Sequence, residues 1–181
     1  MPLVAVDAKT IPTVHTVDAL SLISDSGIVR YQLNAKIWDI YSNSGDSYWY
    51  FPKGIHVERY DSLFHVEGSI VADTAYFFEK KELWRAIGNV VVKNVDGNTF
   101  ETSELFWNQK APPNAGNAFY TFQKVKITSP DGSFLIGANG FRSNQALNPP
   151  FLFSGKGELN VEESSDSIQQ NTVRPDSMQM P

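Results

Sequence analysis

Two pairs of side chains in this sequence have the types that bind metal ions. His56 precedes Glu58 by two residues, and His65 precedes Glu67 by the same interval. On a β-strand this spacing places both members of a pair on one face, where an imidazole and a carboxylate could ligate zinc. Zinc needs three or four converging ligands, and nothing in the sequence joins the two pairs. The sequence therefore predicts outward, solvated side chains and no metal.

Acidic and basic side chains raise two further possibilities, acid–base hydrolysis and phosphate binding. A glycosidase needs two carboxylates at a set separation across a cleft. The candidate carboxylates are Asp61, Glu67, Asp73, Glu79 and Glu82. Lipid phosphates pair well with Lys and Arg, and the candidate cations are Lys53, Arg59, Lys80, Lys81 and Arg85. The cations are scattered among acidic residues, and exposed strand faces are normally acidic somewhere, so solvated surfaces are the favoured interpretation of both sets.

Motifs for nucleophilic catalysis and nucleotide binding are absent from the sequence. It contains no Gly-x-Ser-x-Gly turn, and residues 154–157 (SGKG) lack the spacing and the following Ser or Thr of a P-loop. There is no cysteine, so neither disulfides nor thiolate metal sites exist. The sequence therefore predicts a protein that is not an enzyme and that carries no cofactor.

Composition favours an all-β fold in one domain. The chain has 181 residues, 41% of them apolar and 13% aromatic, and aromatic and β-branched residues suit pleated surfaces. The net charge is −5 and the pI is about 5.1. A nucleic-acid-binding protein would need a basic stripe, so no nucleic-acid partner is expected. No apolar run approaches the roughly 20 residues of a membrane span.

Hydrophobic alternation predicts the strands. Residues 29–37 alternate apolar and polar side chains, and residues 68–110 contain apolar runs that meet at the charged turn 79–82 and at the Asp-Gly turn 96–98. Turn residues of this kind between alternating runs are typical of a β-meander. A further hairpin turn is expected at 130–132, and no helix longer than a turn or two is predicted. About ten strands joined by turns indicate a sandwich, a barrel or a jellyroll.

Three segments follow from this pattern. Residues 1–16 are expected to form an N-terminal linker or edge segment, and residues 17–161 the β-domain, which ends in a short strand over 151–161. Residues 162–181 are polar and have too little to bury to offset the entropy of ordering, so they are predicted to be a disordered C-terminal tail.

Several segments resemble one known family. They are SLISDSGIVRY (residues 21–31), YWYFPKGIHVERYDSLF (48–64), IVADTAYFFEKKELWRAIGNVVV (70–92), FETSELFWNQ (100–109) and GFRSNQ (140–145). In this order they resemble the LptC family, the periplasmic component of the lipopolysaccharide-export ABC transporter, in its Bacteroides-like form. The Ala-Asp-x-Ala-Tyr run (residues 72–76) and the Gly-Asn-Val that follows it (88–90) are also similar to the wider module of lipopolysaccharide-transport bridge proteins.

The resemblance implies a fold, a function, partners and a location. The fold would be a twisted, open β-jellyroll of antiparallel strands, and its function would be to bind lipopolysaccharide and pass it on. It would accept the lipid from inner-membrane ABC transporter subunits and deliver it to a periplasmic bridge protein. Both partners would dock by edge-strand addition, with the N-terminal edge toward the transporter and the edge near residues 137–159 toward the next module. The expected location is the periplasm, with an inner-membrane anchor in an N-terminal segment missing from this chain.

An apolar trough between splayed halves of the sheet would carry the acyl chains. Exposing one chain of a dozen carbons to water costs roughly 10 kcal/mol, at about 0.8 kcal/mol per CH₂. Apolar residues of one strand parity are the candidate lipid-binding residues, although inward apolar residues usually just fill a core. They are Tyr31, Leu33, Ala35, Ile37, Phe64, Val66, Ile70, Tyr76, Phe78, Val90, Val92, Phe100, Leu105, Trp107, Val125 and Ile127.

Two other function classes remain open on the sequence. The first is a β-rich structural adaptor that bridges partners through its edges and binds no lipid. The second is a carbohydrate-binding sandwich in which Trp38, Trp49 and Trp107 act as stacking platforms. Acyl-dependent binding of lipopolysaccharide would distinguish the lipid carrier from both.

Overall fold

The computed structural model describes residues 10–42 and 45–158, which form one antiparallel sheet. The all-β prediction is confirmed, and the only helical turn in the described residues is a short 3₁₀ turn, η1, at Glu79–Lys81. The strands are β1 (Val14–Asp25), β2 (Ile28–Tyr41), β3 (Tyr48–Phe51), β4 (Ile55–Tyr60), β5 (Val66–Ala72), β6 (Thr74–Phe78), β7 (Leu83–Lys93), β8 (Thr99–Asn108), β9 (Phe119–Thr121), β10 (Val125–Thr128), β11 (Phe134–Gly137), β12 (Phe141–Ser143), β13 (Phe151–Leu152) and β14 (Gly155–Glu158).

The sheet is folded along a crease into two layers. β2 pairs with β4 over residues 31–35 and with β3 over residues 39–41, so the strand passes from one layer into the other. β7 changes layers in the same way, since residues 91–93 pair with β5 and residues 83–87 pair with β6. β8 pairs with β10 over residues 99–102 and with β9 over residues 106–107.

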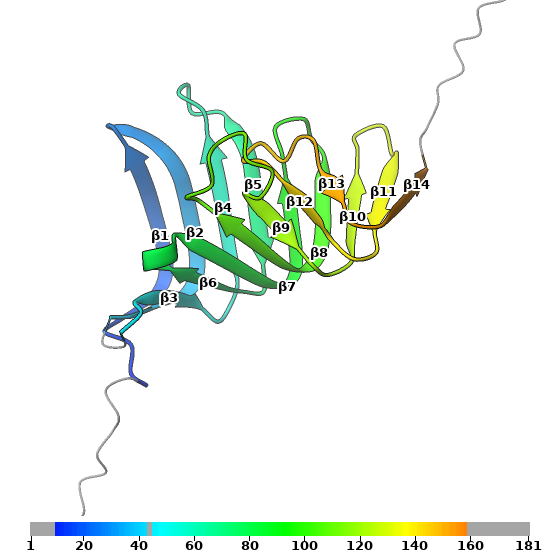
Figure 1. Cartoon of the computed structure of the whole chain (residues 1–181). Helices are drawn as coiled ribbons and strands as arrows, with labels where there is room; N and C mark the ends of the chain where they lie inside the picture. The colour runs from blue at the N-terminus through cyan, green and yellow to red at the C-terminus, as the bar shows by residue number, and fades with distance from the viewer. Residues whose placement is uncertain (1–9, 43–44, 159–181) are drawn as a thin grey trace, which may run out of the picture.

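Short connections cross the crease between the long strands. They lie at residues 52–54, 73, 122–124, 138–140 and 153–154. The first layer contains β4, β5, β10, β11 and β14, and the second contains β3, β6, β9, β12 and β13, while β2, β7 and β8 contribute to both. Figure 1 shows β1 and β14 at opposite ends of the sheet and the hairpin tips of the first layer along the upper edge.

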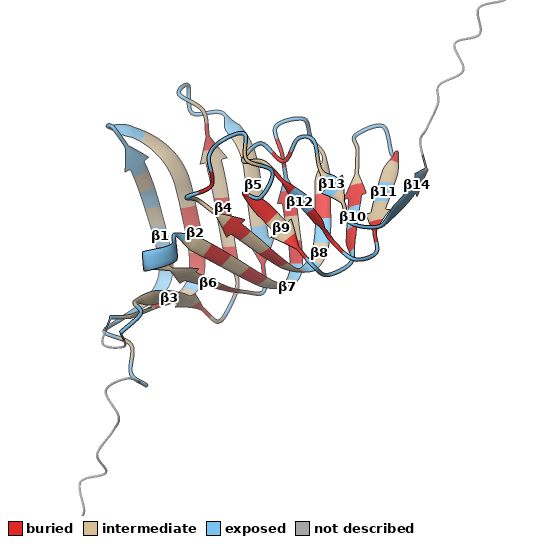
Figure 2. Ribbon diagram, in the orientation of Figure 1, coloured by how far each residue is buried: buried red, intermediate tan, exposed pale blue. Residues whose placement is uncertain are grey.

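The core lies between the two layers. Phe100 of the first layer packs on Phe141 of the second, with ring centroids 5.4 Å apart. Tyr31 packs on Trp107 in the same way, with centroids 5.7 Å apart. Buried residues follow the inner faces of both layers, whereas β1 and β14 are largely exposed (Figure 2). The contact between the layers is thus made by the apolar face of each.

Side-chain alternation shifts by one residue at two places where the chain crosses the crease. In β2, Ala35 and Trp38 both pack inward although they are three residues apart, which leaves Ile37 outside the core. Between β5 and β6, Ala72 and Ala75 both pack inward on either side of Asp73. At these two crossings the inward parity therefore changes, whereas β7 keeps one inward parity from Trp84 to Val92.

Tyr76 and Phe78 consequently face outward, in a row of aromatic and cationic side chains on the outer face of the second layer. Tyr50, Tyr76, Arg85, Phe106, Tyr120, Arg142 and Phe151 are successive cross-strand partners. Tyr50 stacks on Tyr76 with centroids 4.6 Å apart, and Phe106 on Tyr120 with centroids 5.1 Å apart. Because these stacked rings cover each other's faces, the row stabilises the outside of the sheet.

The predicted hairpin turns at 79–82, 96–98 and 130–132 are confirmed. Two boundaries differ from the sequence interpretation. β1 begins at Val14, so the last residues of the segment expected to be a linker or an edge segment belong to a strand of the sheet. The described part of the expected final strand, residues 151–158, contains two strands, β13 and β14, which pair in different layers, and its residues 159–161 lie outside the described residues. Residues 1–9 and the predicted tail 162–181 lie outside the described residues.

The buried contact between layers predicts a large effect of truncation. Phe100→Ala should lower the free energy of unfolding by about 3–5 kcal/mol, because it removes a fully buried ring and leaves a cavity. Phe122→Ala is the matched control, since Phe122 is 66% exposed, and it should cost under about 1 kcal/mol. Urea denaturation measures both, and equal losses would contradict the two-layer packing.

Gly140 allows two backbone segments to meet at the crease. Its φ is +97°, and a Cβ there would lie 2.0 Å from the carbonyl oxygen of Thr121. Gly140→Ala should therefore cost about 2 kcal/mol or more in thermal or urea unfolding. Gly116→Ala, where a Cβ would meet nothing within 4 Å, should leave stability within about 1 kcal/mol of wild type. Similar behaviour of the two variants would show that the crossing is looser than described.

Candidate functional site

The cleft between the two layers is the candidate site. Its mouth lies opposite the crease, between the hairpin tips of the first layer and the loops of the second. Within residues 10–42 and 45–158, no strand of one layer pairs with a strand of the other across this mouth. The two layers could therefore separate there without loss of any ladder hydrogen bond.

The cleft is closed in this structure. Beneath the mouth lies a cavity of about 40 Å³ lined by residues of both layers, among them Tyr31, Ile70 and Trp107. A second, fully apolar space of about 20 Å³ lies deeper, beside Trp84 and Leu105. The first cavity has room for about three water molecules and the second for about one. The expected open trough is thus present as a packed interior that an acyl chain could enter only if the layers moved apart.

Most of the sequence-predicted lining residues come together in this interior. Leu33, Ala35, Val90, Val92, Phe100, Leu105, Trp107, Val125 and Ile127 are buried in one cluster, and Tyr31 and Ile70 pack against it. Burial raises the pKa of the Tyr31 phenol, and the nearby guanidinium of Arg59 partly opposes that rise. The inward position of these eleven lining residues is a geometric finding. Their contact with lipid stays a prediction.

Five of the predicted lining residues lie elsewhere. Ile37 sits at the crease, and Tyr76 and Phe78 belong to the outer face, because the parity shift turns them away from the interior. Phe64 and Val66 lie at the β4–β5 tip and are 55% and 54% exposed. There a bulge between Arg59 and Tyr60 breaks the strand register. The prediction of an inward position was wrong for these five because it assumed one uninterrupted strand.

A short loop covers the mouth of the cleft. Residues 144–148, here called the strap, leave β12 in the second layer and reach the β7–β8 turn of the first. Leu147 is only 4% exposed and packs into the core from above. Its φ is +57°, a left-handed conformation that is unusual for a branched side chain. Asn144 holds the loop together, since its Oδ1 accepts hydrogen bonds from the backbone nitrogens of Ala146 (3.0 Å) and Asn148 (3.1 Å).

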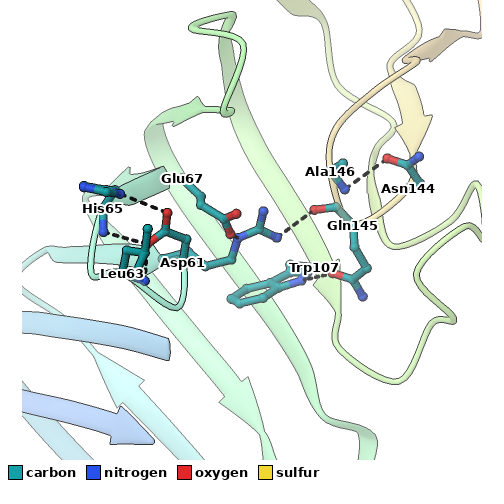
Figure 3. Close-up of polar contacts among 9 residues, drawn as sticks. Asp61, Leu63, His65, Glu67, Trp107, Asn144, Gln145 and Ala146 are labelled. Carbon is teal, nitrogen blue, oxygen red and sulfur yellow. Dashed lines mark hydrogen bonds and ion pairs between the residues drawn. The ribbon is translucent and has the colours of Figure 1, made fainter. Parts of the chain in front are cut away.

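Gln145 attaches the strap to the second layer (Figure 3). Its Oε1 accepts a hydrogen bond from Trp107 Nε1 at 2.9 Å. Its Nε2 donates to the carbonyl oxygens of Asn108 (3.0 Å) and Ala111 (3.2 Å). All polar atoms of the side-chain amide are therefore used on one layer.

Two of the strap's three side-chain bonds to the first layer are longer than those of Gln145 to the second. Arg59 Nη1 donates to the carbonyl oxygen of Gln145 at 3.3 Å, and Asn94 Nδ2 to that of Leu147 at 3.5 Å. Asn148 Nδ2 donates to Asp96 Oδ2 at 3.1 Å. Since hydrogen bonds weaken toward 3.5 Å, the strap is held more firmly by the second layer than by the first.

The rim of the cleft carries one ion pair, and its interior contains a donor without an acceptor. Arg59 Nε lies 3.1 Å from Glu67 Oε2, and both side chains line the cavity beneath the strap. Inside, Trp84 is 8% exposed and its Nε1 has no hydrogen-bond partner among the described residues. A buried N–H without an acceptor costs free energy, so an oxygen atom of a ligand or a water molecule at this depth would be stabilising.

The remaining sequence candidates do not form sites. His65 pairs with Asp61 and Glu67 with Arg59, and the described residues contain no group of three or more potential metal ligands. Trp38, Trp49 and Trp107 pack in or against the core, and their role as sugar-stacking platforms stays a prediction. Among the described residues, no helix is long and apolar enough to cross a membrane.

Sequence reasoning missed the strap altogether. The alternation pattern predicts no structure for residues 144–148, and it places Arg59 on a solvated surface. One signal was present: Leu147 is a single large apolar residue within the polar segment SNQALNPP. An isolated apolar residue in a loop rich in Asn and Pro is a candidate for burial, but its target cannot be known without the fold.

Asp61 orders the β4–β5 tip beside this rim (Figure 3). Its Oδ1 accepts hydrogen bonds from the backbone nitrogens of Leu63 and His65, each at 2.8 Å. The pKa of the Asp61 carboxyl lies below its usual value, mainly because it accepts the hydrogen bond from the backbone nitrogen of His65. Because the folded pKa is lowered, the stabilisation is complete above the unfolded pKa of about 3.9 and is lost as the pH falls through the folded pKa.

Asp61→Ala should therefore lower the melting temperature at neutral pH, by an amount that shrinks toward zero as the pH falls below about 4. Thermal unfolding followed by circular dichroism at a series of pH values measures this difference. Asp131→Ala serves as a comparison at another hairpin tip. A difference between wild type and Asp61→Ala that stays constant down to pH 2 would contradict the assigned role of the carboxylate.

In comparisons with known proteins, no family model and no curated protein match the chain. The cleft is therefore interpreted from its own residues. For residues 10–42 and 45–158, the geometry establishes a two-layer sheet with an apolar interior, a mouth without strand pairing and a strap bound across that mouth.

Proposed function

We propose that this chain is a periplasmic lipopolysaccharide-binding and transfer module of the LptC type. It accepts lipopolysaccharide from an inner-membrane ABC transporter and passes it to a bridge protein. The observation that carries the proposal is the folded sheet, whose apolar faces meet in a cleft that no pairing between described strands closes at the mouth. Such a cleft admits hydrocarbon when its layers part, and the backbone hydrogen bonds of both layers survive the opening.

Energetics favour acyl chains as the occupant. Opening the layers exposes apolar side chains to water, which is unfavourable in proportion to the area exposed. An acyl chain between the layers restores apolar contact on both sides. Its own transfer from water contributes about 0.8 kcal/mol per CH₂. The buried N–H of Trp84 would also gain an acceptor if an ester or amide oxygen of the lipid reached it.

The proposed partners dock on the two ends of the sheet. β1 pairs only with β2, while β13 pairs only with β12 and β14 only with β11. Each end therefore presents backbone groups with no partner strand among the described residues, and such edges accept a strand from another chain. Docking of the transporter at β1 and of the bridge protein at β13 and β14 would align successive clefts into one path.

A structural adaptor is the second candidate, because the interior spaces of about 40 Å³ and 20 Å³ are too small for an acyl chain in the closed state. An adaptor would use the same edges and would keep the layers closed throughout. The two candidates differ in one observable, which is whether lipid reaches the inner face.

Site-specific photo-crosslinking tests the proposed function. A photoreactive residue at Ile70, which packs on the core, should form adducts with lipopolysaccharide. The same residue at Val71, its exposed neighbour on the opposite face, should form at least tenfold fewer. Adducts at neither position, with lipopolysaccharide in excess, would favour the adaptor.

A further inference from the structure

The strap lies across the mouth of the cleft, between Arg59 and Trp107, and this place is here called its seat. It occupies the seat much as an amphiphile would. Leu147 places a branched hydrocarbon in the cleft. Just beside it, two oxygens of Gln145 accept hydrogen bonds from Arg59 and Trp107. An apolar group thus lies next to a pair of acceptor oxygens, which is the arrangement at the head of an acylated or alkylated phosphate.

We propose that the seat of the strap is the binding site for the oxygen-bearing head of such an amphiphile, and that ligand and strap compete for it. The inference rests on the proposed function and deepens it, because it names the residues that meet the head and the segment that must leave. Arg59 Nη1 and Trp107 Nε1 would donate to phosphate or acyl oxygens in place of those of Gln145. The first methylenes of the chain would replace Leu147 between the layers.

Charge at the seat matches an anionic head. Arg59 is about one-third exposed and faces the cavity together with Glu67, whose carboxylate lies 3.1 Å away. Lys93 also lines this cavity. When the strap leaves, Arg59 loses its carbonyl partner and Trp107 its amide partner, so both donors become available. A guanidinium and an indole N–H side by side suit an oxyanion better than a cationic head.

The bond lengths show which contacts would break. Gln145 holds the strap to the second layer with bonds of 2.9–3.2 Å. The contacts of Arg59 and Asn94 with strap carbonyls are 3.3 Å and 3.5 Å long. Leu147 is also held in a left-handed conformation, which costs a branched residue free energy that the released strap would regain. Release therefore begins at the first layer, which frees Arg59, and the incoming head completes it by displacing the Gln145 side chain from Trp107.

Dodecyl phosphate, below its micellar concentration, is the probe, and its binding is measured by titration calorimetry. Inorganic phosphate tests the head alone, and dodecyltrimethylammonium tests the opposite charge on the same chain. Wild type should bind dodecyl phosphate at least tenfold more tightly than either control ligand. Comparable binding of the ammonium analogue would overturn the assignment of an anionic head.

Variants of the strap test the competition. Leu147→Asn keeps a residue that tolerates positive φ but makes burial unfavourable, so it should bind dodecyl phosphate roughly tenfold more tightly. Arg59→Gln should bind it roughly tenfold more weakly. Ala146→Ser, an exposed position in the same loop, should match wild type. Unchanged or weaker binding by Leu147→Asn would show that the strap does not occupy the ligand's place.

Hydrogen exchange of the wild-type chain gives a readout that needs no variant. The amides of Ala146 and Asn148 are bonded to Asn144 and should exchange faster once dodecyl phosphate is bound. Unchanged protection of the strap at saturating ligand would overturn the inference. If lipopolysaccharide still crosslinks at Ile70 in that case, the proposed function stands without it. Binding of dodecyl phosphate that releases the strap, without any binding of lipopolysaccharide, would support the inference while removing the proposed function.

Discussion

Beyond the crease, no strand ladder joins the two layers in the part of the chain that the structure describes, and the rest of the structure depends on the packing of their side chains. Phe100 meets Phe141, and Tyr31 meets Trp107, without any ladder between their strands. Backbone hydrogen bonds therefore fix each layer internally, while apolar packing fixes the angle between the layers. Packing of this kind can be replaced by other hydrocarbon at little net cost, whereas a paired strand cannot.

The strap follows from the same constraint. An apolar mouth left open to water would be unfavourable, and Leu147 covers it with one side chain from a loop of five residues. The side-chain amides of Gln145 and Asn144 are hydrogen-bonded and fix that loop. Few polar groups of the strap therefore lose hydrogen bonds when Leu147 is buried. A segment fixed to one layer and resting on the other closes the cleft and leaves it able to open.

The sequence was sufficient for the fold class because alternation and turn residues are local. The turns at 79–82, 96–98 and 130–132 are set by charged, Gly and Pro residues, and each was found where it was expected. The inward positions of Leu33, Val92 and Phe100 likewise follow from period-two alternation within one layer.

The errors have a common physical cause, because the crease is a property of the assembled sheet. Tyr76 and Phe78 continue the apparent parity of Ile70, yet the bend at Asp73 turns them to the outside. The strap could not be foreseen either: Gln145 and Trp107 are far apart in the sequence and meet only because β12 lies in the same layer as the C-terminal end of β8. Long-range contacts of this kind leave no periodic signal in the sequence.

The most direct test of the account is the distance between the two rims of the cleft. The chain has no cysteine, so spin labels at Ser62→Cys and Asn114→Cys, one at a tip of each layer, would be the only reactive thiols. Pulsed electron resonance would measure the label separation with and without lipopolysaccharide. The account predicts a longer separation when lipid is added. An identical distance distribution at a lipid concentration that saturates binding would contradict it, because the cleft would then have bound nothing between its layers.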